Sequence, residues 1–351
     1  MVPATLVRAA EWLLRVPSTA RAGYGPAYQW SVALFLCLGG LLVLYAAFRH
    51  LEATAGRAVP FLLAFGTLGA TNLPEYLTRG VTYTHITDVA LVFAVWIVAD
   101  RAVLSVRWYA LLGFLVGLAV VVRYTNVLTM PWALAWLWAR GHRPRWRDAV
   151  VFGLGMLLPL GLQVAANVAL WGIPFPEPYA GYRFQWLHPR LWESLLSVER
   201  GWLLWHPWFA LLLALLGLSW RHYRTRRVDQ IVYAAAILAC AGLWYVNAAW
   251  GVWHFGFSFG NRGFLAVTPV LTVMIGTAAP ALLAGVSDPT ESRITVALGL
   301  GVVAFVLWNV NLWLGFLLAA VSRGCLQPPL GDCVWWLVKT LAGLPWAPCG
   351  G

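Results

Sequence analysis

Residues 149–172 read AVVFGLGMLLPLGLQVAANVALWG, a run of 24 residues without a charged side chain. An α-helix rises about 1.5 Å per residue, so about 20 apolar residues cross the ~30 Å hydrocarbon core of a bilayer. In lipid the backbone must satisfy its own hydrogen bonds, and the period-two alternation of a strand is absent. This run therefore predicts a transmembrane helix.

Similar runs recur along the whole chain, which is 61% hydrophobic and 11% charged, with a mean hydropathy of +0.73. An ordinary soluble domain is about a quarter charged, so this composition excludes a soluble globule. The pattern predicts an all-α, polytopic membrane protein of about ten transmembrane helices. The predicted spans are 29–49, 57–72, 85–104, 107–122, 124–139, 149–172, 201–220, 229–250, 263–284 and 293–320.

Two arginine-rich loops predict the orientation of these helices. Residues 139–147 and residues 221–227 carry four arginines each, and two predicted spans separate them. Both loops therefore lie on one side of the membrane, which the positive-inside rule makes the cytoplasmic side. The predicted parts are an outer-side amphipathic N-terminal segment, 1–28, a transmembrane helical domain, 29–320, and an outer-side C-terminal tail, 321–351.

The formal charge of +11 could suggest a nucleic-acid partner. The arginines, however, sit at helix ends and in short loops, where they act as topology signals and contact lipid headgroups. We therefore expect membrane lipid as a partner and no nucleic acid. Residues 1–28 contain no unbroken apolar segment of the kind found in a cleavable signal peptide.

The five cysteines fall into two groups. Cys37 and Cys240 lie inside apolar runs and are expected to be small core residues. Cys325, Cys333 and Cys349 lie in the C-terminal tail, where an oxidising compartment would allow two of them to pair. Cys325 with Cys333 is one option, and metal binding by the three is the less expected alternative.

A first group of polar residues lies at an outer loop. Glu75, His85 and Asp88 are predicted to fall near one membrane face, where carboxylates and a histidine can act as a general base or as metal ligands. Alternatively, Glu75 pairs with Arg79 four residues later and His85 only caps a helix. Asp88 falls in the first turn of an apolar span, where a charge is costly, so it is a candidate catalytic residue together with Glu75.

A second feature is the helix that ends at Arg123. Gly113 and Gly117 form a small-xxx-small face that predicts close helix packing. Arg123 lies at the outer end, where the positive-inside rule disfavours it. It either extends its side chain to the interface or binds an anionic headgroup, since a guanidinium matches phosphate oxygens. We favour the second interpretation.

Two further stretches lie on the same side. His206 precedes Pro207 inside a predicted span, and a structural role in a bent helix is the favoured interpretation. Residues 244–263 combine an aromatic belt with a glycine-rich turn. Aromatic planes with a few polar groups are the usual way to hold a sugar ring. The candidate substrate-binding residues of this stretch are Trp250, Trp253, His254, Asn261 and Arg262.

No phosphate-binding loop, dinucleotide-binding motif, zinc-protease motif or serine nucleophile elbow is present, which argues against ATP hydrolysis and serine hydrolase chemistry. Transporters often carry charged groups near the midplane in inverted repeats, whereas here the polar groups gather at one face. No metal site is predicted.

At these motifs the chain resembles the multispanning glycosyltransferases of the GT-C fold that use lipid-linked sugars. It is most similar to the bacterial dolichyl-phosphate-mannose mannosyltransferase-like and aminoarabinose-transferase-like members. The resemblance covers about residues 25–320. It depends on Tyr83-Thr84-His85, on the helix from Gly113 to Arg123, on Glu199-Arg200-Gly201 with Pro207, and on the stretch from Trp250 to Arg262 followed by Pro269.

The resemblance implies a bacterial cytoplasmic-membrane enzyme whose donor is a polyprenyl-phosphate-linked sugar. Its acceptor would be a glycan, lipid or protein on the non-cytoplasmic side. Arg123 and Arg262 would contact the carrier phosphate, and His85 would line the donor pocket. The family's main catalytic acid lies on a first outer loop, after a first helix, and we expect this sequence to begin near the end of that loop. Four alternatives follow: the start is misplaced, a second chain supplies the missing part, the protein is a non-catalytic relic, or Glu75 or Asp88 substitutes as the base. A divalent cation is left open as a cofactor, without an assigned site.

Two function classes follow. The leading hypothesis is an inverting glycosyltransferase that uses a lipid-linked donor. The alternative is a non-catalytic or truncated GT-C-like membrane protein, or a lipid-carrier binder or flippase.

Overall fold

The computed structural model describes residues 26–78, 84–101, 103, 105–176, 183–256, 258–284, 288–323, 330–342 and 344–345. Its secondary structure is all-α, as predicted, and an isolated bridge between Phe184 and Trp250 is the one strand-like pairing in this part of the chain. Most of the predicted N-terminal segment, 1–28, lies outside the described residues.

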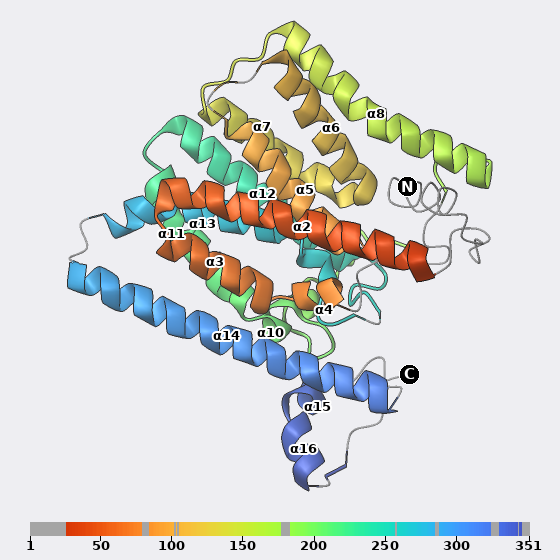
Figure 1. Ribbon diagram of the computed structural model, residues 1–351, viewed down its shortest axis with the longest axis vertical. Coiled ribbons are helices and arrows are strands. Elements are labelled where there is room, and N and C mark those ends of the chain that lie inside the picture. The colour runs from red at the N-terminus through yellow and green to blue at the C-terminus, as the bar shows by residue number, and fades with distance from the viewer. Residues whose placement is uncertain are drawn as a thin grey trace.

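In the part of the chain that the structure describes, ten helices of ten or more residues form the body of the molecule (Figure 1). They are α2 (Pro26–Ala55), α3 (Ala58–Gly69), α5 (His85–Ala99), α6 (Val106–Val122), α7 (Met130–Ala139), α8 (Trp146–Trp171), α11 (Trp208–Tyr223), α12 (Arg227–Ala249), α13 (Val267–Leu283) and α14 (Asp288–Arg323). Shorter elements join them: α4 (Leu73–Thr78), η1 (Tyr124–Thr129), α9 (Leu191–Leu196), α10 (Trp202–Trp205), η2 (Arg262–Phe264), α15 (Leu330–Val334) and α16 (Trp336–Ala342).

Several of these helices have the length and composition of membrane spans. Four contain a segment long and apolar enough to cross a bilayer, namely Ser31–Ala53, Trp146–Trp171, Arg227–Ala249 and Arg293–Ala319. Four others are apolar but shorter, namely α3, α5, α6 and α13. A bundle of this kind is compatible with a membrane protein, because a helix that exposes an apolar surface needs lipid or a partner to cover it.

The helix boundaries differ from the predicted spans where proline or a polar turn intervenes. The predicted span 201–220 is two helices, α10 and α11, with a break at His206 and Pro207. The predicted span 124–139 begins as the 3-10 turn η1, and α7 starts one residue before Pro131. Proline lacks a backbone N–H, so it favours the first turn of a helix and disfavours its interior.

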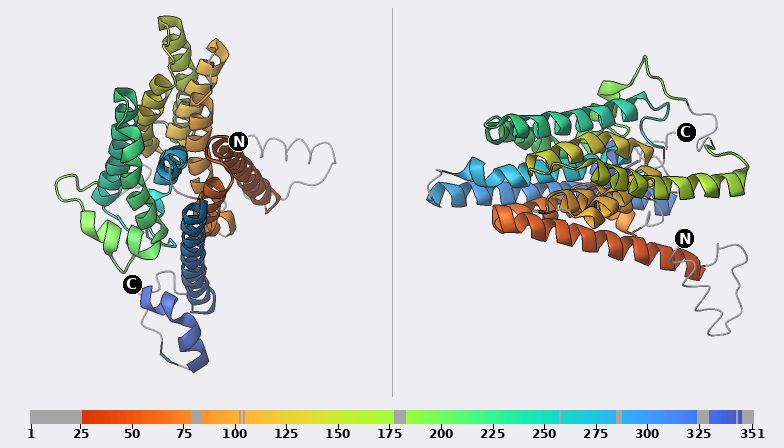
Figure 2. Two further views of the ribbon diagram at one scale, coloured as in Figure 1. Left: turned by 90° about the vertical axis from the view of Figure 1, so that its left-hand side faces the viewer. Right: turned by 90° about the horizontal axis from the view of Figure 1, so that it is seen from above.

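Helix α13 is the centre of the bundle. Twelve of its residues are buried, and it packs against α2, α3, α5, α11 and α12. The left view of Figure 2 shows it surrounded by these helices. Gly276 allows this close packing, because a Cβ there would lie 3.0 Å from a side-chain carbon of Leu51. The core is therefore built around one helix whose residues are mostly buried up to its last turn, where Pro280 and Ala281 are exposed.

Helix α8 lies at the edge of the bundle and packs chiefly against α6. The glycines predicted to form a packing face do so. A Cβ at Gly113 would lie 2.0 Å from the backbone oxygen of Phe152, and one at Gly117 would lie 2.3 Å from that of Met156. Only 6% of the apolar window of α8 is buried, so most of this helix faces outward. Small residues thus bring the two backbones together in the manner of a membrane interface.

The described part of the C-terminal tail packs against the end of α14. Asn311 donates a hydrogen bond to the Val334 carbonyl and accepts one from the Trp336 indole, each at 3.0 Å. Cys333 is buried here as a free thiol, and burial raises its pKa to about 12. Cys325 and Cys349, the other two tail cysteines, lie outside the described residues.

Candidate functional site

The predicted site residues come from elements that meet at one end of the bundle, which we call the α4 end. It contains α4, the start of α5, the end of α6, the end of α12 and the turn η2, and it lies to the right in Figure 1. The loops between α7 and α8 and between α11 and α12 lie at the opposite end.

Asp88 is the most buried charged residue of the α4 end, with an exposure of 0%. Asn126 donates from its side-chain amide to Asp88 Oδ1 at 2.5 Å and to the Ala119 carbonyl at 2.9 Å. The Arg123 guanidinium lies 3.4 Å from Asp88 Oδ2. This carboxylate is hydrogen-bonded and charge-balanced within the protein, as a buried charge must be.

Arg123 ends α6 because its backbone is extended, with a φ of −155°, and the chain then enters η1. Its Nη2 donates to Asn247 Oδ1 at 3.3 Å, and its guanidinium carbon lies 5.9 Å from the centre of the Phe255 ring. A guanidinium has five N–H donors, and the hydrogen bonds seen among the described residues use two of them. Arg123 is therefore held by Asp88 and Asn247 and keeps donors for an anion.

His85 begins α5 and lies between α4 and two arginines. Its ring centre is 4.4 Å from that of Tyr76 in α4. Arg123 contacts Asp88, in the same first turn of α5 as His85. Arg123 also contacts Asn247 and Phe255, and Gly263, the residue after Arg262, packs against both. The structure therefore brings together His85, Arg123 and Arg262, which the sequence placed at the carrier phosphate and in the donor pocket.

Glu75 lies apart from this group, on the side of α4 that faces α14. It is 8% exposed, and the Trp313 indole donates to its Oε2 at 2.7 Å. The alternative partner from the sequence, Arg79, lies outside the described residues. Glu75 and Asp88 therefore share one end of the bundle, but their contacts are with different neighbours.

In the loop after α12, some of the predicted site residues are buried and others are partly exposed. Asn261 is buried, donates to the Trp253 carbonyl at 3.1 Å and accepts from the Gly263 N–H at 3.2 Å. These contacts hold the loop and begin η2. Trp253 is also buried, whereas Trp250 and Arg262 are partly exposed. Trp250 is thus better placed than Trp253 or Asn261 to meet a ligand.

Trp250 and His254 lie at the rim of this loop. The Trp250 ring stacks against Phe255 at 6.5 Å and meets the Phe184 edge at 4.9 Å. His254 Nδ1 accepts from the Gly256 N–H at 3.1 Å. Burial lowers the pKa of His254, the Glu199 carboxylate raises it and Arg200 lowers it. A half-buried imidazole with its Nδ1 occupied leaves Nε2 as its second hydrogen-bonding atom.

His206 has the structural role that the sequence favoured. Its Nδ1 is 2.8 Å from Asn309 Oδ1, and Asn309 donates to the carbonyls of Gly69 and Thr71 at 2.9 and 2.7 Å. Gly260 packs against it with a φ of 62°, where a Cβ would lie 2.1 Å from His206 Nε2. This network joins the end of α3, the break between α10 and α11, and α14.

Two amides that support the site were not predicted from the sequence, and neither were the individual roles of two charged residues. Asn126 and Asn247 hold the Asp88–Arg123 pair, and the signal for both was a polar amide in an apolar stretch, which is costly unless it is used. Arg200 is buried with its guanidinium carbon 4.6 Å from the Trp205 ring centre, and burial lowers its pKa to about 10. Its neighbour Glu199 is an exposed carboxylate of the α4 end.

Within the described residues, no group of three or more His, Cys, Asp or Glu side chains is arranged to hold a metal ion. No family model, curated protein or solved structure matches the chain. The chemistry of the site therefore has to be argued from its own residues. Two arginines and a histidine at one end of an apolar bundle can bind a phosphate at a lipid–water boundary, while nearby aromatic rings can stack on a sugar.

Proposed function

We propose that the protein is a membrane glycosyltransferase that moves a sugar from a polyprenyl-phosphate carrier to an acceptor on the non-cytoplasmic face. The observation that carries this proposal is the grouping of Arg123, Arg262 and His85 at the α4 end, where Arg123 contacts Asp88 of α5 and shares the neighbours Asn247 and Phe255 with the turn η2. Guanidinium groups bind phosphate oxygens through paired, charge-assisted hydrogen bonds, and a membrane-spanning bundle can reach a carrier whose tail stays in lipid.

The proposal includes a GT-C-like arrangement in a bacterial cytoplasmic membrane. The α4 end faces outward, and the two arginine-rich loops of the opposite end face the cytoplasm, in agreement with the positive-inside rule. The ten proposed spans are α2, α3, α5, α6, η1 with α7, α8, α11, α12, α13 and α14.

In the proposed reaction an acceptor hydroxyl loses its proton to a carboxylate, and its oxygen forms a bond to the anomeric carbon of the donor sugar. The bond from that carbon to the carrier phosphate oxygen breaks, and polyprenyl phosphate leaves. Arg123 and Arg262 stabilise the charge that develops on this phosphate. Trp250 provides an aromatic plane for the sugar.

The two predicted catalytic carboxylates have different parts in this scheme. Asp88 is sealed from water and bound to Arg123 and Asn126, so we assign it the positioning of Arg123. Glu75 is assigned the general base because it is the remaining predicted catalytic carboxylate, and the acceptor would reach it from the side of α4 that faces α14. Loss of a general base lowers kcat by about 10²–10⁴-fold. Glu75→Gln should therefore lower kcat, Asp88→Asn should chiefly raise the KM for the donor, and Glu199→Gln is the control for an exposed carboxylate.

A second candidate function is a lipid-carrier binder or flippase without transferase chemistry. It is favoured by the burial of both predicted catalytic carboxylates, 0% exposed for Asp88 and 8% for Glu75. Such a protein would bind the same carrier phosphate through Arg123 and Arg262 but would form no glycosylated product.

A transfer assay in proteoliposomes separates these functions. The probe is polyprenyl-phosphate mannose with a radiolabelled sugar, offered with a bacterial envelope extract as the source of acceptors. We expect labelled product from the native protein and about 10²–10³-fold less from Arg262→Ala, by analogy with loss of an oxyanion donor. Arg293→Ala, at the opposite end, is the matched control. Equal turnover by native protein and Arg262→Ala contradicts the role of Arg262, and movement of the donor without product supports the flippase.

A further inference from the structure

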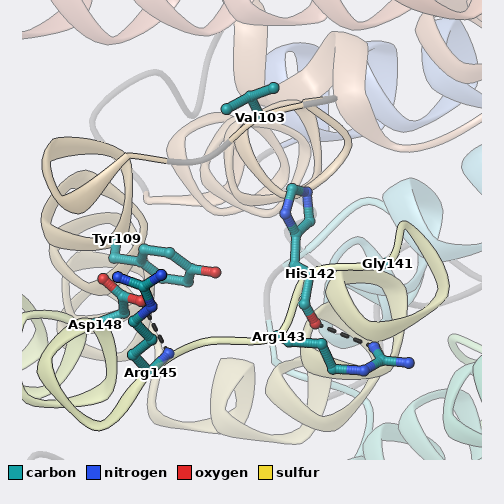
Figure 3. Close-up of a pocket in the computed structure, with 7 residues that line it drawn as sticks. All are labelled: Val103, Tyr109, Gly141, His142, Arg143, Arg145 and Asp148. Carbon is teal, nitrogen blue, oxygen red and sulfur yellow. Dashed lines mark hydrogen bonds between the residues drawn. The ribbon is translucent and has the colours of Figure 1, made fainter.

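The opposite end of the bundle holds a pocket that the proposed transferase site does not use. It has a volume of about 380 Å³ and lies between the start of α6 and the loop that joins α7 to α8. Figure 3 shows Tyr109 and Asp148 on one side and His142 on the other, with the Tyr109 hydroxyl directed toward the space between them. Arg143 and Arg145 complete the polar lining.

The walls of this pocket are fixed by hydrogen bonds of the loop itself. His142 Nε2 lies 2.8 Å from the Arg101 carbonyl, which ties the loop to the end of α5. Arg143 Nη1 donates to the carbonyls of Trp138 and His142 at 3.3 and 3.2 Å. The Arg145 N–H donates to Asp148 at 2.9 Å. These contacts hold the backbone of the loop between the end of α5 and the start of α8, and the side chains of Arg143 and Arg145 remain exposed.

The pocket is strongly basic. Residues 100–109 and 139–148 together contain six arginines and two aspartates. One aspartate, Asp100, is already paired with Arg140 at 3.0 Å, and the other, Asp148, caps the start of α8. Since Asp148 occupies that helix terminus, the attraction for an anion comes from the arginine side chains. Neither aspartate neutralises Arg143 through an ion pair among the described residues.

An exposed apolar surface begins directly at the rim of the pocket. Val103 and Trp146 are 76% and 73% exposed, and Leu154 further along α8 is 62% exposed. The Arg147 guanidinium carbon lies 5.8 Å from the centre of the Trp146 ring, as is common at a membrane interface. A ligand that matches both surfaces has an anionic head and an apolar tail, so it is a lipid rather than a free anion.

We infer that this pocket binds the headgroup of an anionic phospholipid from the leaflet at the opposite end of the bundle. Arg145 contacts the phosphate beside Tyr109, whose hydroxyl donates to a headgroup oxygen. Arg143, which extends away from Tyr109 in Figure 3, reaches the phosphate by turning from the carbonyls of Trp138 and His142. The acyl chains lie along the outward face of α8, which packs chiefly against α6. The lipid would thereby hold the α7–α8 loop, α6 and α8 together. Basic pockets between helices on the cytoplasmic side are known to bind such headgroups.

The test measures lipid retention by native mass spectrometry of the purified full chain in detergent, with phosphatidylglycerol and phosphatidylcholine of equal chain length as probes. We expect the native protein to keep phosphatidylglycerol in preference to phosphatidylcholine. Arg143→Gln/Arg145→Gln should bind phosphatidylglycerol roughly thirtyfold more weakly, from two lost arginine contacts. The control is Arg224→Gln/Arg226→Gln, because Arg226 precedes α12 and pairs with Asp229 much as Arg145 precedes α8.

Three results would overturn the inference. The first is equal retention of both lipids by the native protein, a result that needs no folded variant. The second is an equal loss of phosphatidylglycerol in both double variants. The third is complete competition by glycerol 3-phosphate at the concentration of the lipid, which would make the site one for a free phosphate. Transferase activity enters none of these measurements, so failure here leaves the proposed function at the α4 end unchanged.

Discussion

Helix α5 carries an aspartate at each end, and the two are partnered in different ways. At its first turn, Asp88 is fully buried, and its ion-pair partner Arg123 has a side chain only 15% exposed. At its C-terminal cap, Asp100 is also buried, but its partners His50 and Arg140 have side chains 34% and 47% exposed. The Asp88–Arg123 pair is therefore more deeply buried than the pairs of Asp100, although Arg123 keeps part of its side chain exposed.

The two aspartates also differ in the distances to their partners. Asp100 is held tightly, by His50 at 2.6 Å, by the Trp136 indole at 2.8 Å and by Arg140 at 3.0 Å. These contacts join α2, α5 and α7. Arg123 lies 3.4 Å from Asp88 and is shared with Asn247. A longer, shared contact is what the proposed binding of a phosphate by Arg123 requires, whereas the contacts of Asp100 are short and lie within the protein.

The largest expected effect comes from removing the sealed carboxylate. Asp88→Ala leaves Arg123 without its charge partner in a buried place, and we expect the free energy of unfolding to fall by about 3–5 kcal/mol. Titration with a denaturing detergent in mixed micelles measures this change. Asp88→Asn, which keeps the polar group, should lose less. A loss below about 1 kcal/mol for Asp88→Ala would show that the Asp88–Arg123 pair contributes no more to the free energy of unfolding than an exposed surface ion pair does.

A smaller effect is expected at the amide that supports the pair. Asn126→Ala removes the hydrogen bond to Asp88 and the one to the Ala119 carbonyl, and it should lower the free energy of unfolding by about 2 kcal/mol. In the double variant with Asp88→Ala the two losses should not add, because they remove one shared contact. Strict additivity would contradict the network.

The smallest effect is expected at the opposite end of the same helix. Asp100→Asn keeps an acceptor for the Trp136 indole and removes a charge whose partners are partly exposed. We expect a loss of about 1 kcal/mol or less in the same titration, since hydrated partners replace the lost contact with water. If Asp100→Asn proves as costly as Asp88→Ala, exposure of the partners does not distinguish the two ends.

Much of this arrangement could be predicted from local sequence. The apolar run 149–172 became α8, and the glycines at 113 and 117 pack against it, because both signals are local and directly tied to helix geometry. The all-α class followed from the same runs. The predicted span 201–220 is instead divided at Pro207 into α10 and α11. Whether one proline ends a helix within an apolar run depends on residues that are distant in sequence, so this break could not be predicted.

The candidate site was less predictable, because its contacts join residues far apart in the sequence. His85, Arg123 and Arg262 were each chosen for their chemistry, and the segments that carry them meet in the structure. The sequence could not show that Asp88 binds Arg123, 35 residues away, or that Asn247 supports the same guanidinium from α12. Asn261 was chosen as a sugar-binding residue, but its side chain is used to hold its own loop.

The most direct test of the account is the binding of a polyprenyl phosphate without a sugar to the protein in lipid nanodiscs. Arg123→Gln at the α4 end and Arg140→Gln at the opposite end remove the same charge from the partners of the two α5 aspartates. We predict that Arg123→Gln weakens binding at least tenfold, about 1.4 kcal/mol, while Arg140→Gln leaves it within about twofold. Equal affinities for the two variants would contradict the claim that the α4 end holds the carrier phosphate.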